Sequence, residues 1–330
     1  RRWLLPDEMG KRDTESNFAL GLHIPGAFQK VIDIDACLLQ KEDANNILFE
    51  VKRFARHSGI PVYNLKTHSG IWRFLTIRYS RAFERYMVNI VTSEDISGSI
   101  SPLIDTLNNR FKNVATVVNN ITRKKAAVAV GEKELVLKGD GYLEDKIGDF
   151  TFQISANSFF QTNTRAAEKL YQKAAEFADL KGDETVLDLY SGTGTVPVFL
   201  SGRAKDITGM EISTSAILDA QKNCRANGVD NCRFVLGDIR KQLSSMTVAP
   251  DVIIIDPPRA GMHRDVLNQV LTLSAKTIVY ISCNPATLAR DIGIMAQAYE
   301  VAEIQPVDMF PHTYHVEAVA KLHFRKTIAR

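Results

Sequence analysis

The second half of the chain alternates short apolar runs with segments of helical periodicity from Thr185 onward. Runs of Val, Ile and Leu without polar alternation are typical of strands buried on both faces, as in parallel sheets covered by helices. The pattern therefore predicts a doubly wound α/β sheet, in which ligands bind beyond the carboxyl ends of the strands. The predicted strands are Val186–Tyr190, Asp206–Met210, Arg233–Leu236, Val252–Ile255, Thr277–Ser282, Val301–Asp308 and Ala318–Phe324, with helices that include Ser213–Asn227 and Thr287–Ala298.

The first half lacks a nucleotide-binding glycine pattern and mixes strand-like and helical runs, which predicts an α+β domain. A length of 330 residues favours two domains, and the polar, turn-rich residues 140–150 mark the boundary. We therefore expect an α+β domain over residues 1–144 and a second, doubly wound domain over 145–330. The predicted elements of the first domain are the strands Ile71–Tyr79, Arg85–Thr92 and Val114–Asn120 and the helices Asp43–Ser58 and Ile100–Phe111.

Composition and cysteine usage restrict the class of protein. No run approaches the length of a membrane span, and no signal peptide is visible. The cysteines lack C-x-x-C spacing, which argues against a disulfide framework and against a self-contained zinc site. We expect a cytoplasmic monomer with no membrane partner. Because the chain opens at Arg1 without methionine, we also expect it to be a piece of a longer protein.

Basic residues are concentrated between residues 51 and 85, where Glu84 is the only acidic residue. The basic residues are Lys52, Arg53, Arg56, Lys66, Arg73, Arg78, Arg81 and Arg85, interleaved with aromatic residues. Basic side chains can neutralise phosphates, and aromatic faces can stack on unpaired bases. The stretch predicts RNA contacts by Arg73, Arg78 and Arg81. A sheet with a solvated basic face explains it equally well.

A glycine-rich turn and two carboxylates follow the first three predicted strands of the second domain. Gly192 and Gly194 form a G-x-G, but Pro197 replaces the third glycine of a dinucleotide fingerprint. Glu211 ends the second strand, in position to hold a ribose diol, and Asp238 follows the third, where it can accept from an adenine amino group. Close backbone approach with two carboxylates and no phosphate-binding lysine indicates S-adenosylmethionine. A nicotinamide-dependent oxidoreductase is the alternative that Pro197 disfavours.

The next two strands end in Asp256-Pro257-Pro258-Arg259 and in Ser282-Cys283-Asn284-Pro285. The prolines fix the backbone, so Asp256 can accept a hydrogen bond from a flat heterocycle. An amino-methyltransferase acting on adenine would show an aromatic residue where Arg259 stands. Pro285 predicts a helix start, so we expect Cys283 at a helix N-terminus, where its pKa would be lowered. A buried structural cysteine is the alternative for a lone cysteine.

A cysteine beside a pyrimidine-binding carboxylate and a methyl donor suits one reaction. Uracil C5 is a poor nucleophile until a thiolate adds to C6, after which C5 can take a methyl group. A base must then remove the C5 proton, and Glu317 is the nearest good candidate. His312 or His315 acting through a water is the next candidate. The H-x-x-H-x-E spacing of this segment also suggests a metal site, but it stands in a loop without a partner cluster.

These motifs resemble the RNA uracil-C5 methyltransferase family, and most of all its 23S ribosomal RNA branch. The resemblance covers the whole chain and rests on Asn157–Asn163, Asp188–Gly194, Asp256–Arg259, Ser282–Pro285 and Phe310–Glu317. It implies that Gln161 and Tyr190 join Gly192, Gly194, Glu211, Asp238 and Asp256 in cofactor binding. It also implies that Cys283 is the nucleophile and Glu317 the base. We further expect Phe159, Asp256 and Arg259 at the RNA substrate.

Many ribosomal members of the family carry a [4Fe–4S] cluster held by four cysteines. Cys37 matches the last of these ligands, but the other three would lie before Arg1. The resemblance therefore implies a cluster in the full-length protein and none that this chain completes. We expect residues 1–45 to be the least ordered part of the chain.

The sequence thus predicts an S-adenosylmethionine-dependent enzyme that makes 5-methyluridine in structured RNA, with ribosomal RNA favoured as substrate. Reaching the uracil requires flipping it out of its stack, for which the first domain supplies a charged platform. Transfer RNA is the alternative substrate. An RNA-binding protein without activity is disfavoured by the presence of both Cys283 and Glu317.

Overall fold

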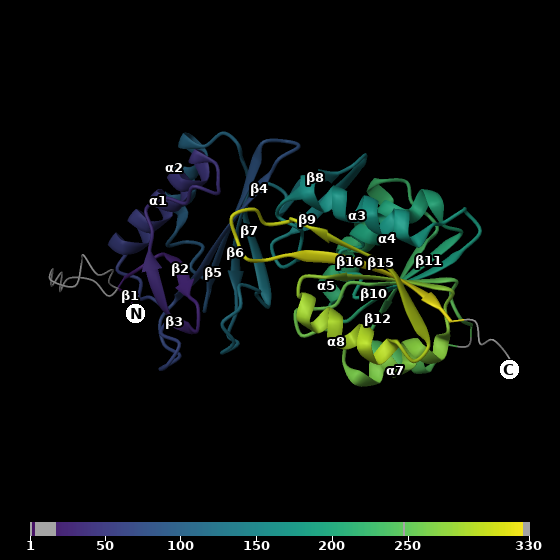
Figure 1. Ribbon diagram of the computed structural model, residues 1–330. Helices are drawn as coiled ribbons and strands as arrows, with labels where there is room; N and C mark the ends of the chain where they lie inside the picture. The colour runs from purple at the N-terminus through teal and green to yellow at the C-terminus, as the bar shows by residue number, and fades with distance from the viewer. Residues whose placement is uncertain (1, 4–17, 247, 326–330) are drawn as a thin grey trace, which may run out of the picture. The chain divides into compact units, whose positions relative to one another are not determined.

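The computed structural model describes residues 2–3, 18–246 and 248–325 (Figure 1). The chain forms two compact units. The first ends at Leu143 and also includes Ser155–Asn157, whereas the second takes Glu144–Ile154 and the chain from Ser158 onward. The expectation for residues 1–45 falls in part on residues 1 and 4–17, which lie outside the described residues. In the described part, no helix has the length and apolar character needed to cross a membrane.

A seven-stranded sheet forms the centre of the second unit. Its strands in spatial order are β12 (Cys232–Leu236), β11 (Asp206–Glu211), β10 (Thr185–Leu189), β13 (Val252–Ile255), β14 (Thr277–Ser282), β16 (Glu317–Phe324) and β15 (Tyr299–Val307). The strands from β12 to β14 are parallel. β16 runs antiparallel to both β14 and β15. The order reverses at β10, so the predicted doubly wound fold is confirmed.

Helices cover both faces of this sheet. One face, termed the α3 face, packs against α3 (Thr164–Ala178), α4 (Thr195–Leu200) and α5 (Thr214–Ala226), with η2 (Ser201–Arg203) following α4. The opposite face packs against α6 (Ile239–Ser244), α7 (Arg264–Leu273) and α8 (Pro285–Met295). Ile254 and Val279 face α3, whereas their neighbours Ile253 and Ile278 face the other way, and all four are fully buried. Two-sided burial, at about 1.5–3 kcal/mol for each large aliphatic side chain, explains why these strands carry no polar alternation.

The first unit is built on a second, four-stranded sheet. It contains β4 (Trp72–Ser80), β5 (Arg85–Thr92), β6 (Val114–Ile121) and β7 (Lys133–Lys138), in that order. The helices α1 (Glu42–His57) and α2 (Ser101–Arg110) pack on one of its faces. A small sheet of β1 (Arg2–Trp3), β3 (Ala27–Asp33) and β2 (Gly21–Ile24) precedes them. The small sheet and β7 were not predicted, because their short polar sequences carry little periodic signal.

Residues 140–150, predicted to be a turn-rich boundary, contain a strand. β8 (Tyr142–Ile147) and β9 (Phe150–Ser155) form a hairpin around Gly148, whose φ of 60° suits glycine. Leu143, Asp145 and Ile147 are buried in alternation with more exposed neighbours, as expected for a strand. The two compact units divide within β8.

Candidate active site

Four chemically active side chains share the α3 face at the carboxyl end of the sheet. Each stands two residues from a side chain that packs on this face, and strand residues two apart point the same way. The pairs are Val186 with Asp188, Ile254 with Asp256, Ile281 with Cys283, and Val319 with Glu317. The sequence placed Asp256 and Cys283 at one edge, and the topology adds Glu317 and Asp188 to them.

The register of β14 with β16 sets Cys283 against Glu317. Ile281 pairs with Val319 and Ser282 pairs with Ala318 in the antiparallel ladder. Continuing this register by one residue places position 283 opposite position 317. Residues directly opposite in an antiparallel pair have Cβ atoms about 4.5–5.5 Å apart on the same face. The register therefore directs the thiol of Cys283 and the carboxyl of Glu317 toward each other across two neighbouring strands.

Two of the three carboxyl groups at this edge, those of Glu317 and Asp256, hold protons more tightly than usual. Glu317 is buried, with 5% of its surface exposed, and burial raises the pKa of its carboxyl, while the nearby Arg259 opposes that rise. Burial, followed by the negative charge of Glu317, raises the pKa of Asp256 to about 7. The negative charge of Glu317 thus acts on Asp256, and Asp256, with a pKa of about 7, can accept or release a proton near neutral pH.

The prediction of a lowered pKa for Cys283 is wrong. Pro285 does open α8, and the side chain of Asn284 caps the helix by accepting a hydrogen bond from the backbone N–H of Ala286 at 3.1 Å. Burial and the negative charges of Glu317 and Asp256 nevertheless raise the pKa of the Cys283 thiol, and they outweigh Arg259 and the backbone hydrogen bond at Cys283. Burial, followed by the charges of two neighbouring carboxylates, therefore outweighs the effect of the helix N-terminus on this thiol.

The backbone around Arg259 is tied to the start of α8. The amide of Asn284 donates to the carbonyl of Arg259 at 3.2 Å, and the hydroxyl of Thr287 donates to the same carbonyl at 3.3 Å. Arg290 donates to the carbonyl of Ala260 at 2.9 Å. The Arg259 side chain itself is exposed, so its guanidinium is available beside Cys283 and Glu317.

The predicted glycine-rich turn after β10 is organised by Glu211. One of its carboxylate oxygens accepts the N–H of Gly192 at 3.0 Å, and the other accepts the N–H groups of Ile212 and Ser213, both at 2.8 Å. Tyr190 adopts a positive φ of 66° at the beginning of this turn. A Cβ added at Gly192 would meet nothing within 4 Å, so its backbone borders open space. At Gly194 a Cβ would lie 2.9 Å from both Ala220 and Phe234, so glycine is needed there for packing.

Asp238 and Gln161, both predicted cofactor residues, have different environments. Asp238 caps α6 and accepts hydrogen bonds from the side chain and backbone N–H of Arg240, which lower the pKa of its carboxyl to about 2. It is therefore ionised at neutral pH. Gln161 is buried, whereas Phe159, two residues before it, is 76% exposed. Asn163 closes this motif by capping α3 and donating to the carbonyl of Met309 at 3.0 Å.

Two further site residues were not assigned roles from the sequence. Asp188 is 1% exposed, neither of its carboxylate oxygens has a hydrogen-bond partner among the described residues, and burial raises its pKa well above the usual value. An acidic residue within an otherwise apolar strand was the available signal. Tyr171 of α3 is buried, and its hydroxyl lies 3.3 Å from that of Thr195. Burial and the charges of Asp256, Asp188 and Glu317 raise its pKa, which places it beside all three carboxylates.

These features fit S-adenosylmethionine. The open space beside Gly192 leaves room for a nucleoside, and Glu211 and Asp238 offer ionisable acceptors to hydroxyl and amino groups. Asp188 has unused acceptor capacity at the same edge. The described part of the chain contains no group of three or more His, Cys, Asp and Glu side chains suited to a metal ion. Cys37 alone cannot hold an iron–sulfur cluster.

The basic residues predicted to contact RNA lie in the first unit. Arg73 is engaged within the protein, because its guanidinium donates to three backbone carbonyls. Arg78 lies partly buried on β4, and Arg81 is exposed in the turn before β5. Lys52, from the same stretch, is buried and forms ion pairs with Asp33 and Asp35, both at 2.9 Å. RNA contact by Arg73, Arg78 and Arg81 stays a prediction.

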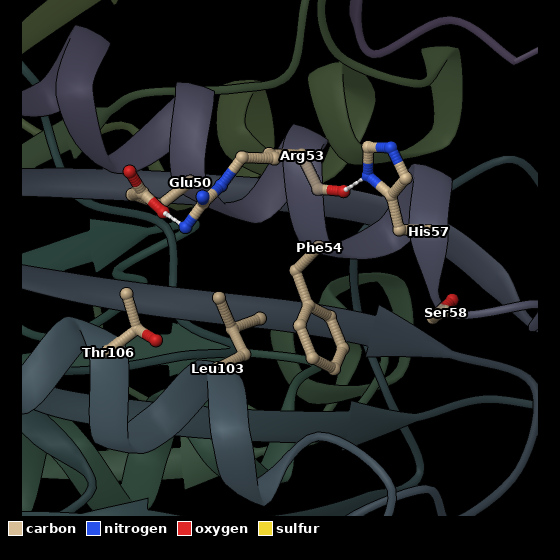
Figure 2. Close-up of a pocket in the computed structure, with 7 residues that line it drawn as sticks. All are labelled: Glu50, Arg53, Phe54, His57, Ser58, Leu103 and Thr106. Atoms are coloured by element: carbon tan, nitrogen blue, oxygen red, sulfur yellow. Dashed lines mark hydrogen bonds and ion pairs between the residues drawn. The ribbon is translucent and has the colours of Figure 1, made fainter.

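A cavity of about 360 Å³ lies between α1 and α2 in the first unit (Figure 2). Figure 2 shows Glu50 paired with Arg53 at one end and His57 bonded to the Arg53 carbonyl at the other, with Phe54 and Leu103 between them. Glu50 is also paired with Arg110, so its carboxylate is satisfied. None of the residues of the active-site edge lines this cavity, and it carries no arrangement of groups for chemistry.

Known proteins resemble this chain over most of its length. An uncharacterized RNA methyltransferase of Chlorobaculum tepidum is 44% identical over 322 residues, covering 95% of this chain and 66% of that protein. Another, from Porphyromonas gingivalis, is 38% identical over 335 residues, covering 98% of this chain and 72% of that protein. The chain thus spans only part of the length of its relatives, 66% for the first of them.

A solved structure of an RNA methyltransferase is also similar to this chain. The Pyrococcus abyssi tRNA (uracil-54, C5)-methyltransferase in complex with S-adenosyl-L-homocysteine superposes with a TM-score of 0.73 at 34% identity, covering 89% of this chain and 71% of that chain. The sheet described above is accordingly that of class I S-adenosylmethionine-dependent methyltransferases. The family model of tRNA (Uracil-5-)-methyltransferase matches residues 73–325, and the chain belongs to this family.

Proposed function

We propose that the protein methylates C5 of a uridine in structured RNA, using S-adenosylmethionine as methyl donor and Cys283 as covalent nucleophile. The observation that carries the proposal is the β14–β16 register, which sets Cys283 opposite Glu317 on the same sheet face as Asp256. Family membership supports the same chemistry. The Pyrococcus abyssi enzyme, bound to S-adenosyl-L-homocysteine, supports the choice of donor.

The proposed reaction uses the described side chains in sequence. Once the Cys283 thiol has passed its proton to water, the thiolate adds to uracil C6 and forms the S–C6 bond, which makes C5 nucleophilic. Bound S-adenosylmethionine would supply an electrophilic methyl group, so that the C5–CH₃ bond forms as the methyl–sulfonium bond breaks and S-adenosylhomocysteine is left. Glu317 then takes the C5 proton as the S–C6 bond breaks, which restores the ring and releases the Cys283 thiolate. A carboxylate whose pKa is raised by burial suits this step, because general bases work best with a pKa near the operating pH.

Asp256 and Arg259 position the substrate in this proposal. Asp256, with a pKa of about 7, is substantially ionised at neutral pH and can accept the N3–H of uracil. The exposed guanidinium of Arg259 favours the thiolate form of Cys283 and offers a cation to an RNA phosphate. Phe159, which belongs to the same motif as Gln161, is exposed and offers an aromatic surface on which a nucleobase of the RNA can stack.

We propose ribosomal RNA, specifically 23S ribosomal RNA, as the substrate, since the motifs resemble that branch most. Transfer RNA is the alternative, supported by the substrate named for the Pyrococcus abyssi relative. Tritiated methyl transfer to ribosomal RNA and to transfer RNA in separate reactions, with the modified nucleotide mapped, tests both. Incorporation at uridine C5 of ribosomal RNA is expected. If label appeared in transfer RNA alone, transfer RNA would take the place of ribosomal RNA as the proposed substrate. If no uridine in either RNA were labelled, the proposed function would be overturned.

A further inference from the structure

The loop between β6 and β7, residues 122–132, carries three consecutive basic residues. Arg123, Lys124 and Lys125 are all exposed, and none of them forms an ion pair within residues 18–246 and 248–325. They stand outside the basic stretch of residues 51–85 that the sequence singled out. Long basic side chains on a surface loop normally carry a large entropic cost when they bind a partner, because the loop must also be ordered.

This loop is held in place by Arg73. One terminal nitrogen of its guanidinium donates to the carbonyls of Thr122 at 3.0 Å and Lys124 at 2.7 Å, and the other donates to the carbonyl of Ala126 at 2.9 Å. The same guanidinium stacks 4.1 Å above the ring of Tyr63. Both terminal nitrogens are therefore directed at the loop backbone, whereas Nε has no hydrogen-bond partner among the described residues. A lysine at this position would keep the charge, but it lacks the planar fork that reaches three carbonyls and stacks on a ring.

The far end of the loop is pinned as well. The side chain of Asn157 accepts the N–H of Gly131 at 2.8 Å and donates to the Gly131 carbonyl at 3.2 Å. The carboxylate of Glu132 accepts the N–H of Arg123 at 2.9 Å. Both ends are thus bonded, and the three cations are presented by a preorganised backbone.

We propose that the β6–β7 loop grips the phosphate backbone of the RNA substrate through Arg123, Lys124 and Lys125, and that Arg73 is the positioning residue that holds it. The inference rests on the proposed function for its ligand, because three adjacent cations on an ordered loop suit a polyanion. It assigns Arg73 a structural task in place of the direct RNA contact that the sequence predicted.

The test compares Arg73→Lys, Arg73→Ala, the double variant Lys124→Ala/Lys125→Ala, and Lys112→Ala as a control. Lys112 is an exposed cation of the same unit that donates only to a helix carbonyl, at 3.2 Å from Asn108. The first measurement is binding of a labelled stem-loop RNA with uridines in its loop, as a function of salt. The second is the initial rate of trypsin cleavage after residues 123–125, which reports on loop order without RNA. Thermal melting checks that each variant folds.

We expect the double variant to flatten the log–log salt dependence by about 1.4 units, since each phosphate contact to single-stranded RNA contributes about 0.7. Arg73→Lys should lose as much affinity as Arg73→Ala and speed loop cleavage severalfold, and combining it with the double variant should add little further loss. Lys112→Ala should change neither measurement. Normal RNA binding by Arg73→Lys would instead make Arg73 a direct contact, and a faster-cleaved loop with unchanged binding would remove the loop from the interface. Either outcome overturns the inference, whereas failure of wild-type methyl transfer overturns only the proposed function.

Discussion

A buried aspartate on one face of the seven-stranded sheet has hydrogen-bond partners, whereas a buried aspartate on the other face has none among the described residues. On the α8 side, Asp291 is fully buried and accepts hydrogen bonds from the backbone of Met262 at 2.8 Å and from the hydroxyl of Tyr280 at 2.6 Å, and it pairs with Arg290 at 2.7 Å. On the α3 face, Asp188 is equally buried, and neither of its oxygens has a partner among the described residues.

The difference separates a structural carboxylate from a functional one. A satisfied buried charge fixes the elements around it, here α8 and the loop that follows β13. An unsatisfied one costs stability and is retained where a ligand or a reaction uses it. The raised pKa values of Asp256 and Glu317 belong to the same unsatisfied region. We therefore expect the α3 face to carry the chemistry and the α8 face to serve as the scaffold.

The largest effect is expected at Cys283 and Glu317, on the α3 face. Cys283→Ala should abolish methyl transfer and any covalent complex, because C5 never becomes nucleophilic without the thiolate. Glu317→Gln keeps the nucleophile but removes the base, so methylated RNA should accumulate while still attached to Cys283. The measurement is a denaturant-resistant protein–RNA band whose mass includes the added methyl group.

Wild-type protein with 5-fluorouridine RNA provides the matched control, since fluorine cannot leave as a proton and the same adduct should be trapped. Normal turnover by Glu317→Gln without a trapped band would show that Glu317 is not the base. His312 or His315 acting through a water would then be tested.

The next effect compares the two buried aspartates directly. Asp291→Asn leaves donors without a charged acceptor and should lower the free energy of unfolding by about 2–4 kcal/mol. Asp188→Asn removes no described hydrogen bond and should leave this free energy unchanged or raise it, while weakening binding of S-adenosyl-L-homocysteine. Urea unfolding and calorimetric titration measure the two quantities. If Asp188→Asn were as destabilising as Asp291→Asn, the distinction between the faces would fail.

A smaller effect should appear in the pH dependence of stability. Asp256 has its pKa raised from 3.8 to about 7, so the folded state binds its proton more tightly than the unfolded state does. Its contribution to stability is complete below about pH 4 and is lost as the pH rises through about 7. Asp256→Asn should therefore be more stable than wild type at pH 8 by about 1–2 kcal/mol, less than the full linkage value because Asp256 is partly exposed, with the difference vanishing near pH 4.

Asp251 is the opposite-sign control for that measurement. The side chain of Lys276 and the backbone N–H of Thr185 lower its pKa to about 2, so its contribution is lost as the pH falls below about 4. Asp251→Asn should be less stable than wild type at pH 7, and the gap should narrow in acid. Equal pH profiles for Asp256→Asn and wild type would contradict the raised pKa.

The smallest effect concerns Tyr171, which lies beside the three carboxylates of the α3 face. Its hydroxyl lies 3.3 Å from that of Thr195, and burial and the charges of these carboxylates raise its pKa, so it is a neutral polar group in this buried region. Removing a polar group makes the surroundings less polar, which raises the pKa of buried carboxyls. Tyr171→Phe should therefore shift the acidic limb of the single-turnover rate profile to higher pH, by about half a unit to one unit. Tyr299→Phe is the matched control, because that buried hydroxyl donates to the Ala275 carbonyl at 2.9 Å on the other face. A uniform loss of rate at every pH would indicate a packing defect only.

Local patterns were sufficient to predict much of the catalytic unit. The apolar strands and their polar ends predicted the doubly wound sheet, and Pro285 predicted the start of α8. The placement of Cys283 and Asp256 at one edge followed from parallel topology alone. Each of these inferences depends on residues that are close in sequence or on a general rule of such sheets.

Contacts between residues far apart in the sequence explain the features of the site that could not be predicted from it. The helix N-terminus predicted a lowered pKa for Cys283, but burial, followed by the charge of Glu317 on a strand 34 residues later, raises that pKa. Tyr171 reaches the site from a helix more than 80 residues before Asp256, a separation that no periodic pattern encodes. The basic stretch predicted Arg73 as an RNA contact, whereas the structure shows its guanidinium donating to a backbone carbonyl of the β6–β7 loop.

The insertion of β16 between β14 and β15 also has a consequence for how the protein acquires its activity. β15 and β16 are sequential antiparallel strands, so this hairpin can form early from local contacts, whereas its docking on β14 closes a longer stretch of chain. Glu317 reaches Cys283 only in that docking step. A folding intermediate with an undocked hairpin would hold a thiol without its base, so catalytic competence should arise late and all at once, as the last edge of the sheet closes.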